Sequence, residues 1–209
     1  MSDFTWSKRP ESTVLSAFAA KNRLAVKSLG RREMLSWEGE NEDTIYIVLS
    51  GTVYIAEINE SGKKNILEFF TCGDIINSGM FPDIHTGSYS CLFAHSGCEI
   101  AGWSFGKLAE ASLKGDKTAS QLMRSAGGIM GRVFIHTSIL QQRTIEDKLM
   151  TFFRYLSRES GGNTFAVPVS YTDLADYLAI DRSAMMRELR RLNDTGKIRS
   201  DKQNITLSD

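Results

Sequence analysis

The hydrophobic positions of this chain change their spacing once, close to residue 115. Between about residues 24 and 105, apolar residues gather in runs of five to eight residues that are rich in β-branched and aromatic side chains. Polar breaks that contain Gly51 and Gly62 separate the first of these runs. Such runs predict β-strands in a small sandwich or roll. The predicted strands cover residues 44–49, 52–58, 65–70, 90–94 and 98–105.

Beyond residue 115 the apolar positions take a helical spacing. Six residues follow one another at alternating intervals of four and three, namely Leu122, Ala126, Ile129, Val133, His136 and Leu140. A long helix with one such stripe packs most simply against its own copy, so we predict a dimerisation helix over residues 116–143. An ordinary amphipathic helix that covers the strand domain is the alternative. Gly127, Gly128 and Gly131 either weaken this helix or mark a close backbone approach.

The last third of the chain carries helix-start signals. Thr144, Ser170 and Asp181 each precede a helical pattern, and the first two are followed three residues later by an aspartate. Side chains of this kind cap a helix by accepting a backbone N–H. Only a short turn separates the last two helices, which predicts a helix-turn-helix. Gly196 ends the second helix, and "KIRSDKQNITLSD" predicts a wing of two short strands about a polar turn.

In the second helix of this motif, apolar and basic residues occupy different faces. The apolar stripe is formed by Met185, Leu189 and Leu192. The second helix of a helix-turn-helix enters the major groove, where arginine holds guanine and serine bonds a base or a phosphate. Ser183 and Arg187 are predicted to read bases, and Arg182 to read a base or hold a phosphate. The full predicted DNA-binding set is Ser170, Arg182, Ser183, Arg187, Arg190 and Arg191, with the last two on phosphates.

Charge supports this assignment through its distribution. The formal net charge of the 209 residues is zero, but residues 182–202 hold seven Lys or Arg against three acids, a net charge of +4. No run approaches the roughly 18 apolar residues that a membrane helix needs, and the N-terminus lacks the apolar run of a signal peptide. We expect a cytoplasmic protein without a membrane partner.

Catalytic and metal chemistry find little support. The three cysteines, Cys72, Cys91 and Cys98, form an odd set without CxxC spacing, which disfavours a disulfide framework and a zinc ribbon. The three histidines, His85, His95 and His136, are isolated, whereas a cupin-like metal site needs several converging ligands. No P-loop, dinucleotide fingerprint or Ser-His-Asp order stands out. We predict neither an enzyme nor a metal site.

Several motifs resemble those of the Crp/Fnr family of bacterial transcription regulators. "TIYIVLSGTVYI" resembles the family's paired strands around a glycine, here Gly51, while "EGE" (38–40) and "CGDII" (72–76) resemble its turns. Asp181-Arg182 followed by Arg187 is similar to its helix-turn-helix pattern, with aspartate in place of serine. The resemblance covers nearly the whole chain.

This resemblance implies an α+β fold in three parts. They are an N-terminal double-stranded β-roll that forms a cyclic-nucleotide-binding-like effector domain (1–115), the long dimerisation helix (116–143) and a C-terminal winged helix-turn-helix (144–209). It further implies a homodimer on a palindromic double-stranded DNA site, with an effector in the β-roll. RNA polymerase is a further candidate partner.

The sequence departs from the family pattern in the effector pocket. Members that bind cyclic nucleotides carry a glutamate and an arginine after the Gly-Asp turn, but Ser78 stands near the glutamate position and no arginine occurs from 33 to 123. A buried phosphate favours a bidentate arginine partner, so a cyclic nucleotide is not expected. An unidentified small molecule would be lined by Ser78, Met80, Phe81, Tyr89 and Ser90.

No cofactor is predicted. Members with an iron-sulfur cluster use N-terminal cysteines, whereas the first cysteine here is Cys72, and His85 is the one candidate for a haem ligand near the pocket. Two alternatives stay open. One is a dimeric regulator that needs no effector and has a degenerate β-roll, and the other is a protein-binding module in which the basic helix is only a solvated face.

Overall fold

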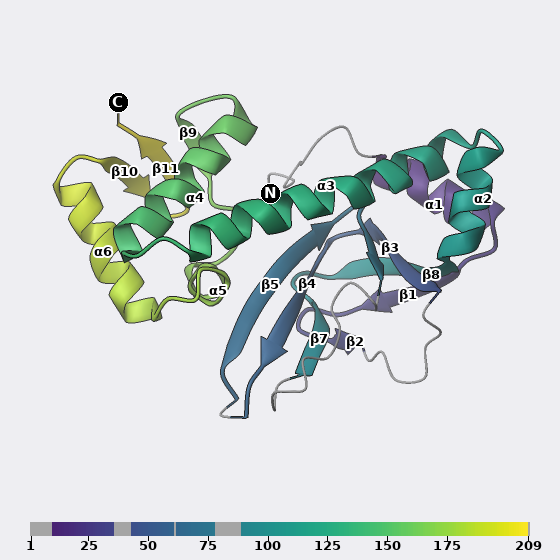
Figure 1. Ribbon diagram of the computed structural model, residues 1–209, viewed down its shortest axis with the longest axis horizontal. Helices are drawn as coiled ribbons and strands as arrows, with labels where there is room; N and C mark the ends of the chain where they lie inside the picture. The colour runs from purple at the N-terminus through teal and green to yellow at the C-terminus, as the bar shows by residue number, and fades with distance from the viewer. Residues whose placement is uncertain (1–9, 36–42, 61, 78–88, 209) are drawn as a thin grey trace. The chain divides into compact units, whose positions relative to one another are not determined.

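A computed structural model of the chain describes residues 10–35, 43–60, 62–77 and 89–208 (Figure 1). Its residues fall into two compact units, one ending at Gly131 and the other beginning at Arg132. This division lies within the long helix α3 (Lys117–Leu140), whose bounds fall inside the predicted range of 116–143. Each unit is described by itself below.

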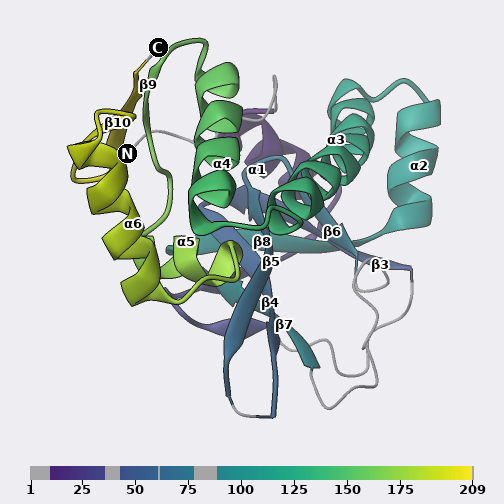
Figure 2. The ribbon, with the colours of Figure 1, turned by 60° about the vertical axis from the view of Figure 1, so that its left-hand side comes forward.

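The N-terminal unit is built on two antiparallel four-stranded sheets (Figure 2). The first has the order β1-β8-β3-β6, formed by Ala25–Leu29, Cys98–Ser104, Thr44–Ser50 and Ile75–Asn77. The second has the order β2-β7-β4-β5, formed by Met34–Leu35, Tyr89–Ala94, Thr52–Ile58 and Lys64–Thr71. All five predicted strands are present, and the roll predicted for this part of the chain is confirmed.

Three helices bury one face of the first sheet. They are α1 (Ser12–Lys21), α2 (Phe105–Leu113) and the first turns of α3. Leu15 and Phe18 of α1, Leu108 of α2 and Leu122 of α3 form one core cluster with the inward residues of β3, which include Ile47. The start of α3 therefore covers the strand domain, as the amphipathic alternative expects.

The turn between β3 and β4 accepts only glycine. Gly51 has φ of +75°, and a Cβ added there would lie 2.4 Å from the carbonyl oxygen of Gly97 and 2.6 Å from the Cβ of Cys98. Both the left-handed backbone and this close approach of the neighbouring strand exclude a side chain. The predicted turn at this position is confirmed.

The C-terminal unit contains the end of α3 and a small helical domain with a three-stranded sheet (Figure 1). Its elements are α4 (Ile145–Ser160), β9 (Thr164–Ala166), α5 (Tyr171–Tyr177), α6 (Arg182–Asp194), β10 (Ile198–Asp201) and β11 (Asn204–Leu207). The sheet has the order β10-β11-β9 and is antiparallel throughout. This arrangement confirms the predicted winged helix-turn-helix.

The capping residues act as predicted. The side chains of Thr144, Ser170 and Asp181 accept the backbone N–H groups of the residues three positions later, at 3.0, 3.1 and 2.8 Å. Gly161 and Gly196 take left-handed φ values of +72° and +71° beyond the ends of α4 and α6. Local sequence signals therefore define where these helices begin and end.

The predicted dimer seam divides into covered and exposed positions. Leu122, Ile129 and His136 are buried within the chain itself, while Ala126 and Val133 are half-buried. Leu140 is exposed, and α3 also exposes two large apolar side chains that the heptad pattern did not include, Met130 and Phe134. Gly127, Gly128 and Gly131 are exposed as well, and an added Cβ would meet nothing within 4 Å at any of them.

The predicted effector pocket lies mostly outside the described residues. This applies to Ser78, Met80 and Phe81, and also to His85 and to the "EGE" turn at 38–40. Tyr89 and Ser90 begin β7, where their backbones pair with Ile58 and Glu57 of β4.

Candidate DNA-binding interface

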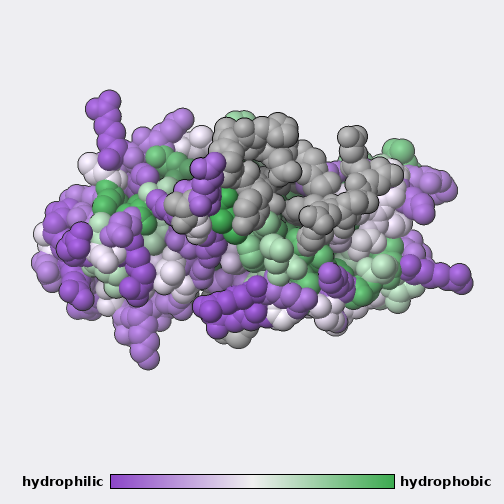
Figure 3. All heavy atoms as spheres, turned by 90° about the horizontal axis from the view of Figure 1, so that it is seen from below, coloured by the Kyte–Doolittle hydropathy of each residue, from purple (hydrophilic) through white to green (hydrophobic). Residues whose placement is uncertain are grey.

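Helix α6 separates an inward apolar face from an outward basic one. Met185, Leu189 and Leu192 are buried, as predicted from their spacing. Ser183, Arg182, Arg187 and Arg190 are exposed, and among the described residues no hydrogen bond or ion pair is found for the three arginines. In Figure 3, hydrophilic side chains dominate the left-hand part of the view, where this unit lies. The exposed arginines therefore present their guanidinium groups to solvent.

The turn before α6 is held from two other helices. His136, near the end of α3, places its Nε2 atom 2.6 Å from the carbonyl oxygen of Tyr177, and Lys148 of α4 donates to the carbonyl of Leu178 at 3.1 Å. Both carbonyls belong to the end of α5, which lacks intrahelical donors for them. Ala179 follows in a left-handed conformation with φ of +51°. The side chains of His136 and Lys148 thus help to fix the orientation of α6 relative to α5.

His136 is therefore part of the packing of the C-terminal unit. Its ring stacks on that of Tyr177 with centroids 3.7 Å apart and an interplanar angle of 8°. Phe152 of α4 packs against the same tyrosine. These contacts occupy the face of His136 that the heptad pattern assigns to a second chain.

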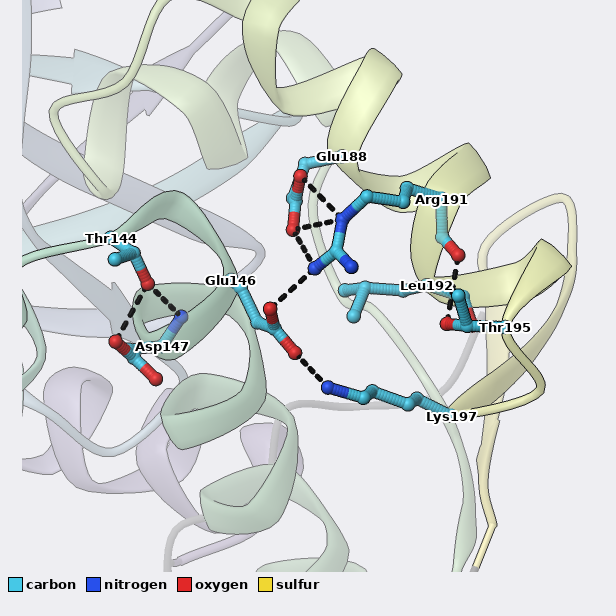
Figure 4. Close-up of polar contacts among 8 residues, drawn as sticks. All are labelled: Thr144, Glu146, Asp147, Glu188, Arg191, Leu192, Thr195 and Lys197. Carbon is cyan, nitrogen blue, oxygen red and sulfur yellow. Dashed lines mark hydrogen bonds and ion pairs between the residues drawn. The ribbon is translucent and has the colours of Figure 1, made fainter.

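Arg191 differs from the other arginines of α6 because its guanidinium group is paired with carboxylates of the same domain (Figure 4). Its Nε atom lies 3.0 and 3.2 Å from the two carboxylate oxygens of Glu188, and its Nη2 atom lies 2.6 Å from Oε1 of the same residue. Nη2 also donates to Glu146, in the first turn of α4. The other oxygen of Glu146 accepts from Lys197, just before β10.

This network shifts the pKa values of Glu146 and Arg191. The hydrogen bond from Lys197, followed by that from Arg191, holds the pKa of Glu146 below its ordinary value. The contacts with Glu188 and then Glu146 raise the pKa of Arg191 above its ordinary value. The charges of Glu146 and Arg191 are therefore retained at neutral pH. The sequence predicts that Arg191 holds a phosphate, whereas in the structure its Nε and Nη2 atoms already have carboxylate partners.

Ser170, also in the predicted DNA-binding set, is engaged in capping α5. Its hydroxyl accepts from the backbone N–H of Asp173 at 3.1 Å and donates to the Asp173 carboxylate at 2.7 Å. The reciprocal pair leaves the Ser170 side chain committed to the start of α5.

The wing is anchored to the first residue of α5 and to the segment just before it. Tyr171 donates its hydroxyl to the carbonyl oxygen of Lys202 at 2.5 Å, and burial raises the pKa of that hydroxyl, which keeps it protonated. Gln203 donates its amide to the carbonyl of Val169 at 2.7 Å. The tip between β10 and β11 is therefore fixed, with the Lys202 side chain exposed.

A buried acid lies in the β-roll, where the sequence analysis named none. Glu68 of β5 is 1% exposed and pairs with Ile55 of β4, on the face that also holds Phe70. One of its carboxylate oxygens accepts from the backbone N–H of Phe69 at 2.8 Å. Asp74, in the Gly-Asp turn, is fully buried and accepts from the N–H of Thr71 at 2.9 Å.

Neither a metal-binding cluster nor a membrane-spanning helix is found among the described residues. Within those ranges, no group of three or more His, Cys, Asp or Glu side chains is placed to hold a metal ion. None of the helices described has both the length and the hydrophobicity to cross a lipid bilayer.

Known proteins match both parts of the chain. A family model for the cyclic nucleotide-binding domain matches residues 26–108, and a model for the Crp-like helix-turn-helix domain matches residues 147–209. The transcriptional activator protein Anr of Pseudomonas protegens is 25% identical over 193 residues, which cover 88% of this chain and 76% of that protein. The nitrogen fixation regulation protein FixK of Bradyrhizobium diazoefficiens is 24% identical over 213 residues, covering 95% and 86%.

Solved structures share the fold. FixK2 from Bradyrhizobium japonicum superposes with a TM-score of 0.63 at 21% identity, covering 89% of this chain and 93% of that one. A cyclic nucleotide-binding domain containing protein from Listeria monocytogenes gives a TM-score of 0.74 at 14% identity, covering 93% and 94%.

Fold, exposed basic helix and matched models together define a transcription regulator with a cyclic-nucleotide-binding-like domain and a winged helix-turn-helix. The chain belongs to the Crp/Fnr family. Regulators of this family bind DNA and act as dimers.

Proposed function

We propose that this regulator binds a palindromic DNA site as a homodimer, with α6 of each protomer in a major groove. The exposed, unpaired row of Arg182, Ser183, Arg187 and Arg190 on α6 carries the proposal. Ser183 and Arg187 lie in the N-terminal half of the helix, from which side chains reach base edges. Arg190, one turn further on, is assigned to a phosphate, and Arg182 to a base or a phosphate.

Dimerisation is assigned to the exposed side of α3. Met130 is 59% exposed and Phe134 is 67% exposed, four residues apart and therefore neighbours on the helix surface. Large apolar side chains on a solvent-facing helix favour burial against a partner. The glycines around them would let a second backbone approach closely, which supports the second of the two explanations offered for these residues.

The effector is proposed to be something other than a cyclic nucleotide. The sequence provides no arginine from 33 to 123, and the interior face of the second sheet carries the buried carboxyl group of Glu68. A phosphodiester in such an interior lacks a bidentate cationic partner. Excess cyclic AMP or cyclic GMP is therefore expected to leave the unfolding temperature unchanged, whereas a ligand at a hundred times its Kd would stabilise by about 2.7 kcal/mol.

The remaining assignments concern catalysis, location and a protein partner, and they rest on the relatives of this chain. We infer a non-enzymatic, cytoplasmic protein, because its curated relatives are transcription regulators. RNA polymerase is proposed as a further partner of the DNA-bound dimer, by analogy with the activators among these relatives.

The test is selection of bound sequences from a random duplex pool by the purified full chain without added ligand. Moderate salt is required, because phosphate contacts alone retain any sequence at low salt. A palindrome with half-sites one helical turn apart is the expected result. Repeating the selection with a small-molecule extract identifies a requirement for an effector. Absence of enrichment in both arms would favour the protein-binding alternative.

A further inference from the structure

Glu146 connects three elements of the DNA-binding domain through one carboxylate. It lies in the first turn of α4, accepts from Arg191 near the end of α6, and accepts from Lys197 at the start of the wing (Figure 4). Arg191 and Lys197 lie 45 and 51 residues away along the chain. The side chain of Glu146 is 26% exposed, so the pairs are partly shielded from solvent.

The apolar stripe of α6 determines which side of the helix is buried, but it defines the rotation of the helix less sharply than a hydrogen bond does. Hydrophobic burial is non-directional, whereas charge-assisted hydrogen bonds have defined geometry. Arg191 lies four residues after Arg187, about one helical turn. A rotation of α6 that breaks the contact between Arg191 and Glu146 therefore also turns Arg187 away from its place in the groove.

We propose that Glu146 is a positioning residue for DNA recognition. By holding Arg191 and Lys197 together, it fixes the orientation of the recognition helix and of the wing relative to α4. This role rests on the proposed use of α6 in the major groove. It also assigns Arg191 to the protein rather than to a phosphate, in contrast to Arg190 beside it.

Glu188 provides a matched control for charge. Glu146 and Glu188 both contact Arg191, and replacing either with glutamine removes one negative charge from the same place. Only Glu146 joins different elements, because Glu188 and Arg191 belong to the same helix. An effect specific to Glu146→Gln therefore reports positioning, and an effect common to both variants reports electrostatics.

The experiment measures the ratio of affinities for the selected duplex and for a scrambled duplex of the same composition. We expect Glu146→Gln to lower this ratio roughly two- to fivefold relative to Glu188→Gln, the range that partly exposed ion pairs support. Arg191→Lys should resemble Glu146→Gln, because a lysine does not reproduce the guanidinium fork. Thermal unfolding of each variant verifies that it is folded.

A second readout separates Arg191 from Arg190. Affinity is measured as a function of salt concentration, where each phosphate contact contributes about 0.9 to the slope of log K against log salt. Arg190→Gln should reduce the slope by about one such contact, and Arg191→Gln should leave it unchanged. Equal ratios for folded Glu146→Gln and Glu188→Gln, or a reduced slope for Arg191→Gln, would overturn the proposal. Loss of sequence preference by the wild-type protein would instead refute the proposed function itself.

Discussion

Two exposed arginines one turn apart on α6 illustrate how position decides role at the scale of single residues. Arg187 lies in the half of the helix that reaches base edges, and Arg191 is held by carboxylates of the same domain. The residue type alone does not distinguish these two side chains. Their partners in the folded domain make them different.

Replacing Arg187 with alanine should weaken binding to the selected site by about 1 to 3 kcal/mol and relax the choice of one base pair. A bidentate contact with guanine is lost, so the other base pairs at that position are no longer disfavoured. Competition binding with duplexes changed at single positions provides the measurement. A uniform loss over all duplexes would show that Arg187 contacts phosphate.

Replacing Gly51 with alanine should destabilise the protein by about 2 to 4 kcal/mol, from the left-handed backbone and the collision with Gly97 and Cys98 together. Gly62 is the control, because it has φ of +76° with nothing within 4 Å of an added Cβ. Gly62→Ala should therefore cost only about 1 kcal/mol. Urea denaturation followed by tryptophan fluorescence, to which Trp103 in β8 contributes, measures both. Equal losses would contradict the role of the close approach.

At the scale of elements, the sequence predicts most boundaries because the signals are local. The caps at Thr144, Ser170 and Asp181 and the strands around Gly51 involve neighbours within a few residues. Two helices were not predicted, for identifiable reasons. Helix α1 starts without a side-chain cap, and α2 follows β8 directly at Ser104, so its first residues continued the pattern of a strand.

Contacts between elements far apart in the chain could not be predicted, because no local sequence pattern indicates them. Glu146 and Lys197 are ordinary surface residues in the sequence, and their pairing depends on the packing of α4, α6 and the wing. His136 fitted the heptad because its spacing is correct, but its stacking partner Tyr177 is 41 residues away. Periodicity identifies which side of a helix is buried without identifying what buries it.

The pairing of Glu146 predicts a pH dependence at this scale. Its pKa lies below the ordinary value of 4.5 in the folded protein, so its contribution to stability is complete above that value. The contribution is lost as the pH falls through the lowered pKa. The stability of the wild-type protein should therefore exceed that of Glu146→Gln at neutral pH, and the difference should diminish as the pH falls below 4.5. Urea titrations of both proteins measure it, and a difference independent of pH would contradict the assignment.

For the whole molecule, the proposed dimer brings two DNA-binding domains, one from each protomer, onto one palindromic DNA site. Each protomer carries no net charge, but the basic segment 182–202 lies at one end of the sequence. In the proposed dimer, two such segments bind one DNA duplex. The affinity for the full palindrome therefore depends more strongly on dimerisation than the affinity for a single half-site does.

Phe134→Asp should dissociate the proposed dimer, because it would bury a charge in an apolar contact. Leu113→Asp is the control, since Leu113 is 90% exposed and belongs to α2 rather than to the proposed interface on α3. Analytical ultracentrifugation should find monomers for the first variant and dimers for the second. Dimers of Phe134→Asp with unchanged affinity for the palindrome would move the interface to another surface.

The anchored wing has a consequence for proteolysis. A surface loop with a lysine at its tip is an ordinary target for trypsin, but a protease needs several residues on each side of the bond in an extended form. The hydrogen bonds from Tyr171 to Lys202 and from Gln203 to Val169 hold the tip in its turn. Cleavage after Lys202 therefore requires a larger opening of the domain, and its rate reports the free energy of that opening rather than the local mobility of a loop.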